Sequence, residues 1–159
     1  MWGNHECGNE KGKEFVKSLE KTGVNVSENE NVSVKIKNDE VNICGVEFYI
    51  KREEYKKSLQ GIDYKNYTIL LSHSPNRPIY YSSGVEDLIV SGHTHGGQVR
   101  LPIIGAVVAP GQGFFPKYDK GLFKLGNSHI YIDSGLGNSV FPIRFLNRVQ
   151  ISNIKINPS

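Results

Sequence analysis

Two histidines one residue apart carry the clearest chemical signal of this chain. His93 and His95 lie in the glycine-rich stretch SGHTHGGQ at residues 91–98, directly after the apolar run at 88–90. Side chains two residues apart on extended backbone point in the same direction, and two neutral imidazole nitrogens that face one point form a common metal ligand pair. The alternative is that both rings only pack against a loop or are solvated.

Other residues of the same kind occur elsewhere in the chain. Asn4 and His5 stand next to one another, and His73 lies between serines before a proline. Several histidines gathered in one small domain are hard to explain by packing, because each buried ring nitrogen needs a hydrogen-bond partner. An asparagine with several histidines, and no thiolate, suits Mn, Fe or Zn better than Ca or Mg. His129 begins a predicted strand and is expected to be structural.

Two apolar runs of strand length, residues 67–71 and 88–90, lead into these histidines. Each run is nearly continuous, which is typical of a strand that is covered on both faces. A short helix predicted within 76–86 separates them, so we expect a parallel βαβ pair with adjacent carboxyl ends. Ligands of open α/β sheets bind at that edge, and the three histidines that follow the runs are predicted to converge there.

The remaining elements are predicted from apolar periodicity and turn-forming residues. A helical pattern occurs over residues 10–22 and over residues 52–60. Alternating apolar residues predict antiparallel hairpins over 32–43 and 122–132, and a half-exposed strand over 149–156. Residues 101–121 are rich in Gly and Pro and are expected to form a loop.

Composition excludes several classes of protein. The 159 residues suit one domain, and the net charge of +3 is small, with lysines scattered mainly over 11–21 and 51–57, so no nucleic-acid partner is suggested. Cys7 and Cys44 form neither a disulfide framework nor a thiolate zinc motif. No signal peptide, anchor or transmembrane run is recognisable, so we expect a cytoplasmic protein or one peripheral to the membrane.

Three motifs, in order, resemble the second half of the calcineurin-like metallophosphoesterases. They are GNHE at residues 3–6, LSHSP at 71–75 and SGHTHGGQ at 91–98. Each motif alone is weak, but the ordered set, with each motif after a fitting element, is strongly specific and covers nearly the whole chain.

The tail is similar to the closing segment of a bacterial branch of that family that carries GHTHGGQ. The matching residues are DSGLG at 133–137 and FPIR at 141–144. In that branch an arginine-bearing segment continues into a Pro-Glu pair, whereas Arg148 here is followed by Val149 and Gln150.

The resemblance implies a four-layer α/β/β/α sandwich that holds two divalent metal ions, Mn, Fe or Zn, at the strand ends. Asn4, His73 and His93 would bind one ion, His95 would belong to the other, and His5 would donate a proton to the leaving group. The implied reaction is hydrolysis of a phosphoester substrate, a monoester, diester or pyrophosphate, by metal-activated hydroxide.

The chain departs from the family in its acidic residues. The family's Asp-x-His and Gly-Asp-x-x-Asp segments do not occur here, and a bridging carboxylate is what holds two like-charged ions together. We therefore expect residues 1–159 to be a single, partial domain without its N-terminal βαβ part, through a truncated gene, a mis-called start codon or a split domain. Such a chain would hold one metal or fewer and have impaired activity. It would self-associate through an exposed sheet edge or through the surface left by the missing N-terminal half.

Two further readings stay open. The chain is either part of a phosphoesterase or a non-catalytic remnant that binds a metal or a partner on the same fold.

Arg100 and Arg144 are candidates for contacts to substrate phosphate, although a lone surface arginine is more often solvated. Gly96 and Gly97 are expected to permit a turn that closes the histidine loop.

Overall fold

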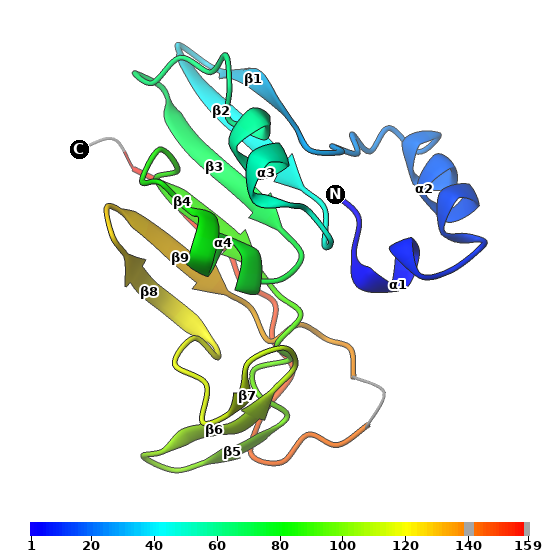
Figure 1. Cartoon of the computed structure of the whole chain (residues 1–159), viewed down its shortest axis with the longest axis vertical. Helices are drawn as coiled ribbons and strands as arrows, with labels where there is room; N and C mark the ends of the chain where they lie inside the picture. The colour runs from blue at the N-terminus through cyan, green and yellow to red at the C-terminus, as the bar shows by residue number, and fades with distance from the viewer. Residues whose placement is uncertain (139–141, 158–159) are drawn as a thin grey trace.

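The computed structural model describes residues 1–138 and 142–157. Its largest element is a six-stranded sheet with the strand order β1-β2-β3-β4-β9-β8 (Figure 1). The strands of this sheet are β1 (Glu30–Ile36), β2 (Asp39–Val46), β3 (Tyr67–Ser72), β4 (Leu88–Ser91), β8 (Gly121–Leu125) and β9 (Ser128–Ile132). Phe141 of the tail motif lies outside the described residues.

The centre of the sheet is parallel and its edges are antiparallel. β2, β3, β4 and β9 run in the same direction, while β1 pairs with β2 and β8 pairs with β9 in the opposite sense. The two predicted hairpins and the predicted parallel βαβ pair are confirmed, with α4 (Asn76–Tyr81) between β3 and β4. Four parallel strands therefore end at one edge of the sheet, where the histidine segments begin.

One face of the sheet carries the hydrophobic core. Both predicted helices are confirmed, as α2 (Gly12–Glu20) and α3 (Arg52–Ser58), and α1 (Asn4–Cys7) precedes them. Tyr55 of α3 is fully buried and packs with Leu70 and Ile89 of the central strands. Burying a side chain of this size stabilises the fold by about 1.5–3 kcal/mol, so this contact anchors α3 to the sheet.

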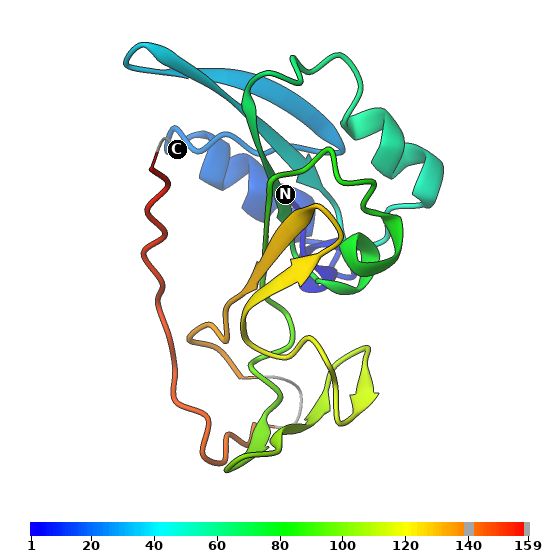
Figure 2. The ribbon, with the colours of Figure 1, turned by 90° about the vertical axis from the view of Figure 1, so that its left-hand side faces the viewer.

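The opposite face of the sheet is only half covered. Alternate residues of the central strands, Ile43, Ile69, Leu71 and Val90, are half-buried there. Figure 2 shows the C-terminal segment on the opposite side of the sheet from α3 and α4. This architecture is a mixed α/β fold with a six-stranded mixed sheet, and its second face is apolar.

The strand expected over residues 149–156 is wrong. This segment has no strand, because side chains rather than a backbone ladder hold it. Gln150 Nε2 donates to the Tyr131 hydroxyl at 2.8 Å, and Ser152 donates to Asp133. The apolar residue between them, Ile151, is left 82% exposed.

The loop expected over residues 101–121 is only partly correct. Its first half belongs to a three-stranded antiparallel sheet of β5 (Val99–Leu101), β6 (Gly105–Ala109) and β7 (Gly113–Phe114). These strands are too short to show an alternating pattern, and glycines with positive φ, Gly105 and Gly111, begin or separate them. The small sheet lies beyond the carboxyl edge of the large one (Figure 1).

No helix in the described part of the chain combines the length and the apolar character that a membrane span requires.

Candidate metal centre

Three of the predicted ligands meet at the carboxyl edge of the sheet. Nε2 of His73, just after β3, lies 2.7 Å from Oδ1 of Asn4. The same nitrogen lies 3.1 Å from Nδ1 of His93, just after β4. Asn4, His73 and His93, hereafter the Asn-His-His cluster, thus bring together one candidate ligand from α1 and two from neighbouring strand ends.

The first turn of the chain positions Asn4 beside His73. The backbone N–H of Gly3 donates to Oε2 of Glu6 at 3.0 Å, and the N–H of Cys7 donates to the Gly3 carbonyl at 3.0 Å. A Cβ atom on Gly3 would lie 2.9 Å from Nδ1 of His73. Only glycine permits this approach, so Gly3 sets the distance between α1 and His73, and Glu6 has a structural role.

The donor set of the cluster fits a cation. Nε2 of a neutral imidazole holds either one proton or one lone pair, so it satisfies only one of its two close contacts at a time. A cation shared by three lone pairs would satisfy all three groups. Ligands about 2.1 Å from a metal and at right angles lie about 3 Å apart, which matches the spacing in the cluster.

The electrostatic environment keeps these rings neutral. Burial, followed by the charges of His73 and His95, lowers the pKa of His93 to about 4. The pKa of His73 is also lowered, mainly by burial. Both imidazoles are therefore neutral at pH 7. Each ring has a lone pair available for a cation even when no ion is bound.

Phe48 is a member of the site that the sequence analysis missed. Its ring centroid lies 5.7 Å from that of His73 and 5.0 Å from that of His93. It follows β2, the parallel neighbour of β3, and its place at a strand end was the signal that could have revealed it. Phe48 shields one side of both imidazoles from water.

His95 stands apart from the cluster. Its Nδ1 lies 3.2 Å from the carbonyl oxygen of Gly137. No hydrogen bond between described residues joins it to the cluster, although its charge lowers the pKa of His73 and His93. Burial lowers the pKa of His95 itself, and the charge of Arg144 acts in the same direction.

His5 is exposed on α1, beside Asn4. Its charge contributes to the lowered pKa of His73, His93 and His95, so it faces the same region. Among the residues that the structure describes, no group of three or more His, Cys, Asp or Glu side chains is arranged to hold a metal. The third member of the cluster is an amide, Asn4.

The extended backbone expected through the histidine pair is wrong. His93 and His95 have φ values of 66° and 50°, in the left-handed region that non-glycine residues rarely adopt. The two rings consequently have different partners. A left-handed conformation at two such residues costs free energy and is typical of functional sites.

The expected turn at the two glycines is confirmed. A Cβ on Gly97 would lie 2.1 Å from Cβ of Ala106 in β6, and one on Gly96 would lie 2.7 Å from Oδ1 of Asn147. Asn147 also donates from Nδ2 to the His95 carbonyl at 2.5 Å. The small sheet and the tail together hold the histidine loop closed.

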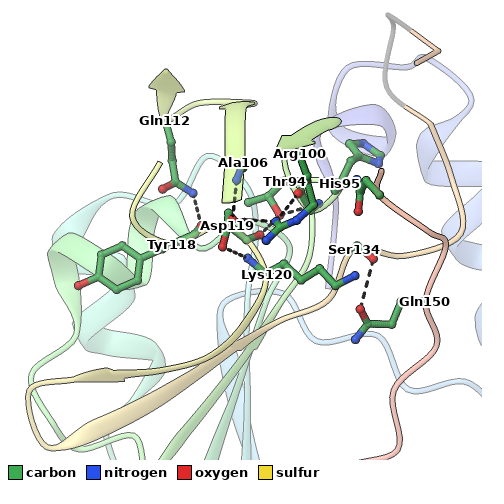
Figure 3. A network of polar contacts seen from close by, with 12 residues as sticks. Thr94, His95, Arg100, Ala106, Gln112, Tyr118, Asp119, Lys120, Ser134 and Gln150 are labelled. Carbon is green, nitrogen blue, oxygen red and sulfur yellow. Dashed lines mark hydrogen bonds and ion pairs between the residues drawn. The ribbon is translucent and has the colours of Figure 1, made fainter. Parts of the chain in front are cut away.

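Asp119 stabilises this loop through hydrogen bonds, and no sequence pattern indicated this role. Arg100 donates from Nη1 to Oδ2 of Asp119 and to the carbonyl of Gly96, both at 2.7 Å (Figure 3). Thr94, which is fully buried, donates to the Asp119 carbonyl at 2.8 Å. Nη1 of Arg100 is therefore used within the fold, and the side chain is only partly exposed.

Comparison with known proteins shows homology to bacterial metallophosphoesterases. The chain is 35% identical over 99 residues to the uncharacterized metallophosphoesterase YkuE of Bacillus subtilis, covering 62% of this chain and 34% of YkuE. It is 29% identical over 155 residues to YkoQ, an uncharacterized metallophosphoesterase of the same species, covering 96% of this chain and 57% of YkoQ. It is 33% identical over 88 residues to the phosphodiesterase YaeI of Escherichia coli, covering 55% of this chain and 32% of YaeI.

The chain thus spans 34% of the length of YkuE and 57% of that of YkoQ. No family model matches it, and neither does any solved structure.

Proposed function

Because this chain is homologous to bacterial metallophosphoesterases, we propose that it forms the metal-binding C-terminal part of a phosphoester hydrolase. The observation that carries the proposal is the meeting of Asn4 Oδ1 and His93 Nδ1 at Nε2 of His73. The substrate class is a phosphomonoester, a phosphodiester or a pyrophosphate.

Each member of the site has a role in this proposal. Asn4, His73 and His93 hold one divalent ion, Mn, Fe or Zn, and His95 serves a second. A bound ion supplies Lewis acidity at phosphorus and an activated water. His5, exposed beside Asn4, protonates the leaving alkoxide, a role worth roughly 10²–10⁴-fold in rate.

The acidic groups that would complete the site are absent from this sequence. It contains neither the Asp-x-His nor the Gly-Asp-x-x-Asp segment. We infer that the chain alone holds one ion or fewer and turns substrate over weakly. In the complete domain a further βαβ unit would supply the missing ligands and build the four-layer sandwich. The half-buried apolar residues on the second face of the sheet, among them Ile69, Leu71 and Val90, support such a covering layer.

A second candidate function is a non-catalytic module that binds a metal or a partner. The Asn-His-His cluster contains no carboxylate that could bridge two ions. It could therefore bind a single ion without a second one, and this favours the non-catalytic module. Co-expression with the N-terminal half of a homologous metallophosphoesterase separates the two candidates. Restored hydrolysis supports the enzyme, and bound metal with no hydrolysis supports the module.

The direct test is a metal titration of the purified chain. We expect Mn²⁺ or Zn²⁺ to bind at up to one ion per chain by calorimetry, and binding to be lost in His93→Ala. His129→Ala is the matched control, because His129 is exposed on β9. Metal affinity that is the same in both variants and in the unchanged chain would contradict the proposal.

Turnover of a generic phosphodiester gives a second readout in the same preparations. The isolated chain is expected to show little or none with Mn²⁺. Robust turnover that His93→Ala abolishes would show that the missing acidic segments are not required.

A further inference from the structure

Arg144 is held inside the turn that follows β9. Its Nη2 donates to the carbonyls of Ser134 at 2.7 Å, Gly135 at 3.2 Å and Gly137 at 2.5 Å. Its Nε donates to the Gly137 carbonyl at 3.1 Å and to Oδ1 of Asn138 at 3.3 Å. These five contacts, shared among the three N–H groups of Nε and Nη2, bind the Arg144 guanidinium to residues 134–138.

The third nitrogen of the same side chain is enclosed. Nη1 of Arg144 is buried, with no hydrogen-bond partner among the described residues. A buried atom is not open to a phosphate in solution. Both earlier readings of Arg144, a solvated arginine and a direct phosphate contact, fit this environment poorly.

His95 shares one acceptor with Arg144. Nδ1 of His95 lies 3.2 Å from the Gly137 carbonyl oxygen, which also accepts from Arg144. A carbonyl oxygen only accepts, so a nitrogen that hydrogen-bonds to it must carry the proton. The hydrogen bond therefore requires a proton on Nδ1 of His95, and in the neutral ring this leaves a lone pair on Nε2.

We propose that Arg144 is a positioning residue for His95, one that fixes the Gly137 carbonyl so that His95 keeps its proton on Nδ1 and presents Nε2 as a ligand. The inference rests on the proposed function, in which His95 binds a metal ion. Histidines that bind metals commonly donate their other N–H to a carbonyl, which fixes both tautomer and ring orientation. The planar fork of arginine suits this role, because a lysine ammonium cannot reproduce its set of directed donors.

The first test reads the tautomer of His95 directly, without metal. Long-range ¹H–¹⁵N NMR of the full chain is expected to show a proton on Nδ1 of His95. In Arg144→Ala the signal should shift toward the tautomer protonated on Nε2, since the carbonyl is no longer held. Arg148→Ala is the control, because Arg148 is an exposed arginine of the same tail. A His95 tautomer that is the same in Arg144→Ala and Arg148→Ala would overturn the proposal.

The second test is a mutant cycle in metal affinity. Loss of a residue that orients a ligand typically weakens metal binding 10–100-fold. In the chain co-expressed with the N-terminal half of a homologous metallophosphoesterase, where His95 has a second ion to bind, we expect the affinity for that second Mn²⁺ or Zn²⁺ to fall by about this factor in Arg144→Ala. In the His95→Ala background the same substitution should have no further effect. An equal loss in both backgrounds would mean that Arg144 acts on the fold in general, and would overturn the positioning role.

Arg144→Lys keeps the experiment decisive if the alanine variant does not fold. This variant preserves the positive charge and removes the planar guanidinium, so the tautomer of His95 is expected to shift in the same direction as in Arg144→Ala. An unchanged His95 tautomer in Arg144→Lys would overturn the proposal. Failure of the proposed function is distinguishable: the unchanged chain would then bind no metal, while the tautomer of His95 would still depend on Arg144.

Discussion

Nε2 of His73 lies 2.7 Å from Oδ1 of Asn4, although 69 positions separate the two residues in the sequence. The contact depends on the tight approach of the first turn to the carboxyl edge of the sheet. Gly3 makes that approach possible, because its backbone passes where a side chain would meet the imidazole. The candidate metal centre is therefore sensitive to changes that touch no ligand.

Gly3→Ala tests this dependence. The added Cβ would lie 2.6 Å from Oε2 of Glu6 and 2.9 Å from Nδ1 of His73. Overpacking of this kind costs about 1–3 kcal/mol or moves the backbone, so metal affinity should fall and the melting temperature should drop. Ser33→Ala is the control, because Ser33 is exposed on the edge strand β1. Equal metal affinity in the two variants would contradict the role given to Gly3.

Asp119→Asn tests the hydrogen bonds that stabilise the histidine loop. The carboxylate accepts from Arg100 and from the N–H of Ala106, and the Arg100 and Asp119 side chains are only 23% and 13% exposed. Hydrogen bonds to charged groups contribute about 1.5–3 kcal/mol, and a loss of stability in this range is expected in chemical denaturation. The exposed pair Lys56–Glu53 provides the comparison, with side chains 57% and 77% exposed. Glu53→Gln should change stability by less than about 1 kcal/mol, and a larger effect there than at Asp119 would refute the assignment.

Tyr55→Phe tests the polar contact beneath α3. The Tyr55 hydroxyl donates to Oε1 of the fully buried Glu86 at 2.5 Å. Its removal leaves that carboxylate with Ser82 as its remaining side-chain donor among the described residues, and an unsatisfied buried acceptor costs about 1–3 kcal/mol. Tyr80→Phe, at a tyrosine that is 72% exposed, should leave the melting temperature unchanged. Equal melting temperatures for both variants would show that the contact adds nothing to stability.

The thiol of Cys44 is expected to resist alkylation until the protein unfolds. Burial, followed by the charge of Glu86, raises its pKa to about 11 from the usual value of 9. The thiolate is the reactive form, so its fraction at pH 8 should be about a hundredfold lower in the folded than in the unfolded state. Because the unfolded chain releases this proton first, the same shift makes stability fall as the pH rises above 9. Mass spectrometry after iodoacetamide treatment, with and without denaturant, measures the protection, and rapid labelling of Cys44 in the folded protein would contradict it.

Self-association is expected from the β1 edge of the large sheet. Val32, Val34 and Ile36 of this edge strand are 49%, 38% and 52% exposed, and an apolar edge can pair with another chain. Light scattering should show a mass that rises with concentration, and Val34→Lys should reduce it. Val149→Lys, in the tail and outside the sheet, should not. A monomer at every concentration would exclude this behaviour.

Much of this arrangement could be predicted from the sequence, because it depends on local patterns. The apolar runs before His73 and His93 have the length and continuity of buried parallel strands, and the chain between them is long enough for one short helix. Strand direction then places both histidines at one edge. Phe48 follows the same rule, but its strand β2 pairs antiparallel with β1 as well as parallel with β3, and the alternating sequence pattern predicts only the hairpin.

The rest depends on contacts that no local pattern reveals. The left-handed backbone at His93 and His95 is maintained by Asn147 and by the approach of Gly97 to Ala106, both distant in sequence. The strands of the small sheet are two to five residues long, and Asp119 ties them to the loop. The tail shows the alternation of a strand, yet the side chains of Gln150 and Ser152, rather than a backbone ladder, hold it.

The position of α1 has a consequence for the order of folding. The buried core cluster runs from Cys44 to Ile132 and includes no residue of α1, so the sheet can assemble before the first eight residues are in place. Contacts between distant parts of a chain form late, because closing long loops costs entropy. The Asn-His-His cluster would then be completed in the last step, and proteolytic removal of the first turn would separate metal binding from the stability of the domain.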